Sequence, residues 1–184
     1  MERAFGLLLV AVAISGCAPA GDTDRSREKG DRVGGIQGYT LAPETVAALA
    51  SAQHLAAETG SGLVTPGHLA LGLLANGSGT AGAVARAREV DVIALTAALR
   101  ALPGGPPRDA TLGDRAPYSD AARRALGRAM DHAAALGHRD LLGADILYGV
   151  SAEGQEPAAR ALAAAGLDSG AITAAARTLP DSAS

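Results

Sequence analysis

The second half of this chain repeats the first, and this duplication constrains the fold more than any other feature of the sequence. Residue n matches residue n + 77 from Pro43 to Pro103 without a gap, and 19 of these 61 positions are identical. Ten of the identities are pairs of alanine, several of which arise by chance in a chain so rich in alanine. The evidence for two copies of one unit therefore rests on nine other pairs: Leu49/Leu126, Gly60/Gly137, Gly72/Gly149, Gly77/Gly154, Asp91/Asp168, Thr96/Thr173, Arg100/Arg177, Leu102/Leu179 and Pro103/Pro180.

Each copy is predicted to form four helices. Alanine is the best helix former and buries little area, so 44 alanines favour helices over strands. Ser119, Asp91 and Asp168 are typical N-caps, and Thr65-Pro66 is a cap followed by a proline at the first helical position. Four short helices with few large apolar side chains bury too little surface alone. We therefore expect one all-α unit of eight helices, a duplicated four-helix repeat related by a pseudo-twofold axis.

The first seventeen residues have the layout of a secretory signal. Arg3 precedes an uncharged apolar run from Ala4 to Ile14, which is shorter than the roughly twenty residues of a transmembrane helix. Ile14-Ser15-Gly16-Cys17 resembles the bacterial lipobox, and this resemblance implies a lipid attached to Cys17. Residues 18–39 are rich in Gly, Asp and Arg without apolar periodicity, which predicts a flexible tether.

The duplicated unit resembles the repeat of the Clp N-terminal domain, the substrate-binding and adaptor-binding module of the Clp/Hsp100 unfoldases. The resemblance covers nearly all of the chain beyond residue 40. The first copy contains Thr65-Pro66-Gly67-His68-Leu69, close to a Thr-Pro-Glu-His-Leu variant of the family. The steps that match the family in the second copy are Tyr118-Ser119, Leu136-Gly137-His138, Ile146-Leu147-Tyr148-Gly149-Val150, Glu153-Gly154, Ala158-Ala159-Arg160-Ala161-Leu162 and Gly166-Leu167-Asp168.

This resemblance implies a module that binds peptides or proteins in a shallow groove between helices. Its motif positions give Thr65, His68, Asp145 and Tyr148 as candidate groove residues. In some family members an acidic residue in each Thr-Glu-His step binds the guanidinium group of phosphoarginine, but here those positions hold Gly67 and Ala144. The resemblance therefore does not imply phosphoarginine binding in the usual mode, and Asp145 is the neighbouring acid left to substitute in part.

Other functional classes find little support. Fifteen arginines and one lysine against 19 acids leave a net charge of -3, so we expect no nucleic-acid partner. Gly77–Gly82 spells G-x-G-x-x-G without an acid about twenty residues later, and Lys29 stands outside any phosphate-binding loop, so we expect no nucleotide and no ATPase activity. His54 with Glu58, and His132 with His138, are interpreted as surface or capping residues, and no metal or other cofactor is expected. Arg123, Arg124 and Arg128 are interpreted as a solvated helical face, paired locally through Asp120.

The sequence thus predicts a signal at 1–17, a tether at 18–39 and a Clp N-terminal-type domain at 40–180. The repeats would span 41–103 and 118–180, with a Pro/Gly linker at 104–117. We expect a non-enzymatic peptide-binding or protein-binding module, lipid-anchored through Cys17 at the outer face of a bacterial membrane. The alternatives are a cytosolic adaptor or decoy for Clp machinery, in which residues 1–17 are not a signal, and a hydrolase or metalloprotein on the same scaffold.

Overall fold

The computed structural model describes residues 39–75, 77–108 and 115–179. The predicted signal, Cys17 and all of the tether before Tyr39 lie outside these ranges. Within them the chain forms eight helices and two strands of two residues each. The elements in order are β1 (Thr40–Leu41), α1 (Pro43–Glu58), α2 (Pro66–Leu74), α3 (Gly79–Ala87), α4 (Val92–Arg100), α5 (Asp120–Leu136), β2 (Asp140–Leu141), α6 (Gly143–Ala152), α7 (Pro157–Ala164) and α8 (Ser169–Ala176).

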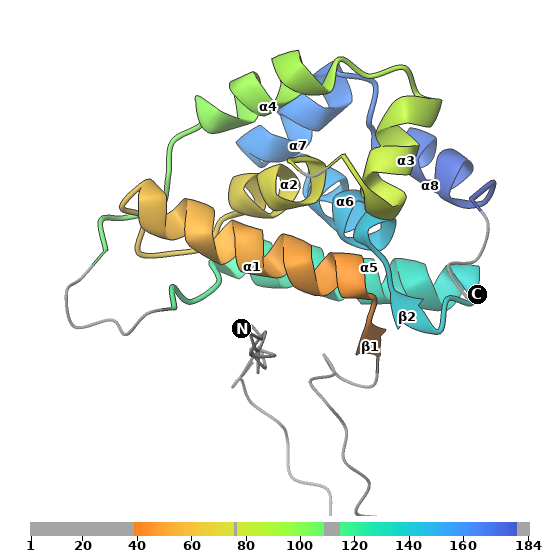
Figure 1. The fold of residues 1–184 in the computed structure, drawn as a ribbon, viewed down its shortest axis with the longest axis horizontal. Coiled ribbons are helices and arrows are strands. Elements are labelled where there is room, and N and C mark those ends of the chain that lie inside the picture. The colour runs from red at the N-terminus through yellow and green to blue at the C-terminus, as the bar shows by residue number, and fades with distance from the viewer. Residues whose placement is uncertain (1–38, 76, 109–114, 180–184) are drawn as a thin grey trace, which may run out of the picture.

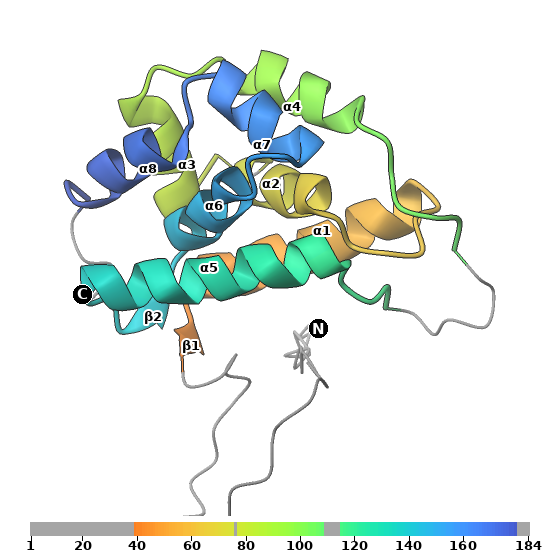
Figure 2. The same cartoon turned by 180° about the vertical axis from the view of Figure 1, so that it is seen from behind.

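The eight helices confirm the predicted all-α fold class. The first four helices, α1–α4, and the last four, α5–α8, begin at positions that agree closely with the register of 77 residues seen in the sequence. The helices form three tiers (Figures 1 and 2). α1 and α5 lie on one side, α2 and α6 lie in the middle, and α3, α4, α7 and α8 lie on the other side. The packing is also repeated: α2 packs on α7 as α6 packs on α3, and α2 and α6 contact each other. One continuous core runs through both copies.

The duplicated glycines of the middle helices allow the closest helix crossings in the fold. A methyl group on Gly72 would lie 2.4 Å from the carbonyl oxygen of Ala48 in α1. A methyl group on Gly149 would lie 2.0 Å from the carbonyl oxygen of Ala125 in α5. Both distances are far below van der Waals contact, so only glycine lets these backbones approach so closely.

The predicted helix ends are also found. Ser119, Asp91 and Asp168 each accept a hydrogen bond from a backbone N–H in the first turn of the following helix, at 2.8–3.1 Å. Gly137 ends α5 with a left-handed φ of 74°. Local sequence chemistry therefore places these boundaries in both copies.

Two features differ from the sequence-based expectation. β1 and β2 pair in parallel, and Tyr39, assigned to the tether, packs against the core. Part of the predicted linker is also tied down, since the Gln53 side chain bonds both the N–H and the carbonyl of Ala116 at 3.0 Å. These contacts join residues 63 to 100 positions apart, so local periodicity carries no signal for them.

Candidate binding groove

Thr65 and His68 form the N-terminus of α2. The Thr65 N–H donates to Nδ1 of His68 at 3.1 Å, while Nε2 of His68 lies 3.3 Å from the Thr59 hydroxyl. Because Nδ1 accepts a backbone hydrogen bond, it carries no proton. Burial lowers the pKa of His68, against a smaller opposing effect of a backbone hydrogen bond at Leu63. The imidazole is therefore a neutral, structural part of this helix end.

Two cavities open over this helix end. The first, called the open pocket, has a volume of about 320 Å³ and lies between the N-termini of α2, α5 and α7. The second, called the side pocket, has a volume of about 370 Å³ and lies between the ends of α1 and α4 and the start of α2. Together they form what we call the α2 groove, since they share five lining residues: Thr65, Gly67, Leu102, Pro103 and Gly104.

The α2 groove is lined by both apolar and polar groups. Thr65 lines both pockets, and His68 lines the side pocket, as do Glu58 and Arg100. Glu156 lines the open pocket. The structure thus brings two of the four candidate groove residues, Thr65 and His68, to one concave surface.

Asp145 lies elsewhere and is fully buried, so its assignment to a ligand groove is corrected here. Its carboxylate accepts the Leu142 N–H at 3.0 Å and lies 2.7 Å from Nδ1 of His132 and 3.0 Å from Nδ1 of His138. A buried carboxylate needs such donors, because an unpaired charge inside a protein is strongly unfavourable. These partners leave Asp145 a structural role, capping α6 at the position where His68 caps α2.

Tyr148 belongs to the same cluster. Its half-buried ring stacks on His132 with centroids 3.9 Å apart, and Nε2 of His132 lies 3.1 Å from the Thr173 hydroxyl. His132 was given a surface or capping role; it is buried, so the surface part of that interpretation is wrong. The sequence held one signal for this buried cluster, namely that Asp145 in the second copy replaces His68 of the first. An acid at a buried cap position requires nearby donors, and the two histidines supply them.

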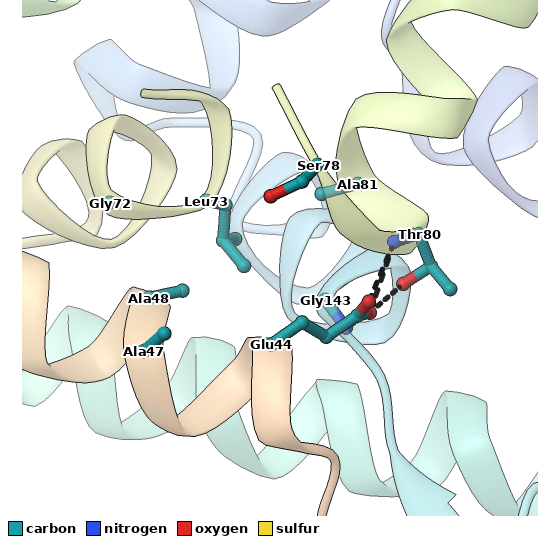
Figure 3. A pocket seen from close by; sticks show the side chains of 9 residues that line it. All are labelled: Glu44, Ala47, Ala48, Gly72, Leu73, Ser78, Thr80, Ala81 and Gly143. Carbon is teal, nitrogen blue, oxygen red and sulfur yellow. Dashed lines mark hydrogen bonds between the residues drawn. The ribbon is translucent and has the colours of Figure 1, made fainter. Parts of the chain in front are cut away.

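The N-terminus of α6 also has a cavity, and the side chain of Glu44 reaches across it toward Thr80 and Gly143 (Figure 3). The Glu44 carboxylate accepts the Thr80 N–H at 3.0 and 3.1 Å, the Thr80 hydroxyl at 2.5 Å and the Gly143 N–H at 3.2 Å. The Thr80 hydroxyl oxygen in turn accepts the Ala144 N–H at 3.0 Å. What remains is a cavity of about 40 Å³, called the closed pocket. Sequence reasoning missed Glu44 and Thr80, because 36 residues separate them.

The predicted arginine face is paired differently from the sequence expectation. Arg123 bonds Asp120 as expected, but Arg124 and Arg128 donate to Glu153 at 2.9 and 2.7 Å. Burial alone would raise the pKa of Glu153, but hydrogen bonds and charge from these two arginines outweigh it and lower the pKa. The face therefore anchors the buried Glu153 side chain to α5.

No group of three His, Cys, Asp or Glu side chains among residues 39–75, 77–108 and 115–179 has an arrangement that would hold a metal ion. Nε2 of His54 lies 3.1 Å from the Glu58 carboxylate, and both side chains are exposed. None of the helices in the described part of the chain is both long and apolar enough to cross a membrane.

Comparison with known proteins places this architecture. The family model of the Clp repeat N-terminal domain matches residues 41–165. The Hsp104 N-terminal domain from Candida albicans superposes with a TM-score of 0.60 and 14% identity, over 76% of this chain and 90% of that one. The N-terminal domain of the ClpD chaperone from Arabidopsis thaliana gives a TM-score of 0.57 and 19% identity, over 79% and 97%. A protein studied in a malarial protein secretion system gives a TM-score of 0.62 and 19% identity, over 75% and 92%. No curated protein sequence matches significantly.

A duplicated four-helix bundle with a groove over one helix N-terminus defines an all-α repeat module. The family match covers the first copy and the second copy as far as α7, which is more than half of the chain. The chain belongs to the Clp repeat N-terminal domain family.

Proposed function

We propose that this protein binds segments of other polypeptides in the α2 groove and does so without catalysing a reaction. Membership of a family of substrate-binding and adaptor-binding domains supports a protein partner. The observation that carries the proposal is the groove itself, two adjoining cavities of about 320 and 370 Å³ at the junction of both repeats. Concave surfaces of this size that combine apolar walls with a few polar groups are typical binding sites.

The chemistry of the groove suits an extended peptide with apolar side chains. Leu102, Pro103 and Gly104 provide a wall common to both pockets. The five residues shared by the two pockets are uncharged, and His68 in the side pocket is neutral. Glu58, Arg100 and Glu156 provide charges of both signs around it. Apolar contacts in the pockets would supply most of the affinity, and the charged groups would set orientation.

A binding experiment with a permanently unfolded polypeptide tests this function. Reduced and carboxymethylated lactalbumin, labelled with a fluorophore, is titrated with the purified protein and followed by anisotropy. Leu102→Asp places a charge in the wall shared by both pockets and should weaken binding by about tenfold or more. Ile93→Asp is the matched control, since Ile93 lies on α4 with 83% of its surface exposed and outside both pockets.

The result is read after circular dichroism shows that both variants are folded. Binding that is weakened by Leu102→Asp but not by Ile93→Asp supports the proposal. Absence of binding by the parent protein, or an equal effect of both substitutions, contradicts it.

We further propose that a lipid on Cys17 anchors the protein at the outer face of a bacterial membrane. The support is the sequence of residues 1–17, in which the apolar run from Ala4 to Ile14 is followed by Ser15, Gly16 and the chain's single cysteine. The test is partitioning into detergent, together with mass spectrometry of the mature amino terminus, for the parent and Cys17→Ala proteins. A diacylated Cys17, and loss of membrane partitioning in the variant, are expected. An intact Met1 with unchanged partitioning would instead favour a cytosolic adaptor.

A further inference from the structure

The open pocket and the closed pocket are the same site in the two repeats. The open pocket lies where the N-terminus of α2 meets those of α5 and α7, and the closed pocket lies where the N-terminus of α6 meets those of α1 and α3. The register of 77 residues relates these two sets of helices. One site nevertheless has a cavity of about 320 Å³, while the other retains about 40 Å³.

Matched exchanges of residues account for this difference. The closed pocket has an acid, two groups that donate to it and a glycine that makes room for it. The open pocket has none of these groups at the equivalent positions. The exchanged pairs, with the closed pocket first, are Glu44 and Ala121, Thr80 and Pro157, Gly143 and Pro66, and Gly79 and Glu156.

In the closed pocket these residues stabilise a carboxylate. The backbone N–H groups of Thr80 and Gly143 stand at the N-terminal ends of two helices, where the helix dipole favours a negative charge. Gly79 has a φ of 84°, and a methyl group on it would lie 2.5 Å from Oε2 of Glu44. The site is thus built around the Glu44 side chain, which four hydrogen bonds hold in place.

In the open pocket the same positions cannot hold an anion in this way. Pro66 and Pro157 stand where Gly143 and Thr80 stand in the closed pocket, and proline has no N–H to donate. The two backbone donors to Glu44 therefore have no counterpart here, and neither does the Thr80 hydroxyl. Ala121 provides no acceptor for a cationic group where Glu44 stands in the other copy, and the acid that does line this pocket, Glu156, already faces the Arg124 guanidinium at 3.8 Å. A charged group entering this pocket would lose water without gaining those partners, which is unfavourable, whereas an apolar group would gain by leaving water.

From these exchanges we infer that only one of the two pseudo-equivalent sites, the open pocket, takes up a side chain of the bound polypeptide. We infer further that this side chain is uncharged and aliphatic. Glu44 is the built-in occupant of the other site and prevents a second ligand side chain from entering. This inference rests on the proposed function, because it names the kind of side chain that the α2 groove selects.

Chemical-shift mapping with small probes tests the inference separately from polypeptide binding. The purified ¹⁵N-labelled protein is titrated with N-acetyl-leucinamide and, in parallel, with N-acetyl-aspartic acid amide. The leucine probe should shift the amide signals of Gly67, Gly104 and Ala158 around the open pocket. The signals of Ala81 and Gly143 around the closed pocket should not move, and the aspartate probe should affect the open pocket at least fivefold less.

Two variants exchange the properties of the sites. Ala121→Glu puts the acid into the open pocket and should weaken the leucine probe about tenfold. Glu44→Ala empties the closed pocket and should produce new shifts at Ala81 and Gly143. If Glu44→Ala does not give a dispersed spectrum, the parent protein and Ala121→Glu still decide the question.

Several outcomes would overturn the inference: probe shifts at both sites of the parent protein, no shifts at the open pocket, a preference of that pocket for the aspartate probe, or unchanged binding by Ala121→Glu. Failure of the proposed function gives a different pattern. In that case unfolded lactalbumin does not bind, while the leucine probe still shifts the amide signals around the open pocket. If lactalbumin binds and Ala121→Glu leaves the leucine probe unaffected, only the inference fails.

Discussion

Gly149→Ala should be strongly destabilising, although alanine is the better helix former. Gly149 lies inside α6, where the exchange would ordinarily gain about 1 kcal/mol from helix propensity. The added methyl group would lie 2.0 Å from the Ala125 carbonyl oxygen, about 1.4 Å closer than ordinary contact begins at 3.4 Å. The obstructing atom is backbone, so a side-chain rotation cannot relieve the clash and α5 must move away from α6.

The magnitude follows from that displacement. Overpacking a core typically costs about 1–3 kcal/mol, and a gap of even 1 Å removes much of the dispersion energy between packed surfaces. Both terms act along the α5–α6 contact, so their sum exceeds the propensity gain. We expect a net loss of about 3 kcal/mol, which corresponds to a fall in Tm of roughly 6–12 °C for a protein of this size.

Gly127→Ala is the matched control. Gly127 also lies inside a helix, α5, but a methyl group there meets no atom within 4 Å. The same exchange should therefore stabilise the protein by about 0.5–1 kcal/mol. Urea unfolding followed by circular dichroism measures both variants. If Gly149→Ala matches or exceeds the stability of the parent while Gly127→Ala behaves as expected, the close crossing of α5 and α6 is refuted.

Three further predictions concern polar groups of the second repeat. Asp145→Asn should lower the free energy of unfolding in urea by about 2–4 kcal/mol, since an amide cannot accept from Leu142, His132 and His138 together. A stability within about 1 kcal/mol of the parent would show that the buried cluster is not needed. Glu153→Gln should cost about 1 kcal/mol at pH 7, because the partner arginines are half exposed. Because the pKa of Glu153 is lowered, its contribution to the free energy of unfolding is complete above the ordinary pKa of 4.5 and is lost as the pH falls through the folded-state pKa. The parent and Glu153→Gln proteins should therefore become equally stable in acid. A difference in stability that stays constant with pH would contradict this. Asp168→Ala should cost about 1 kcal/mol through loss of the α8 cap, and Tm measurements showing no change would contradict the capping role.

Much of the fold could be predicted because its signals are local. Helix caps such as Ser119 and Asp168 act within three residues, so they can be read directly from the sequence. The β1–β2 pairing and the Gln53–Ala116 bonds were missed because they depend on the position of segments that are distant in the chain. For the same reason, His132 and His138 were given a surface or capping role and not a place around the buried Asp145 carboxylate.

The candidate site was predicted only in part. The family motif identified Thr65 and His68, which do line the α2 groove. It also suggested Asp145, because a motif aligns positions without stating whether a side chain faces a groove or the core. Glu44 and Thr80, which close the other pocket, were not among the residues of the family motif.

The sequence by itself determined that the protein is a duplicated all-α module, because a gapless repeat with matched caps and glycines permits few other folds. Only the tertiary structure decided how the two repeats differ in chemistry. A pocket is formed by helix ends that are distant in sequence, and its content depends on which side chains meet there. Exchanging Glu44 for Ala121 looks minor in an alignment, yet in three dimensions it separates a filled site from an open one.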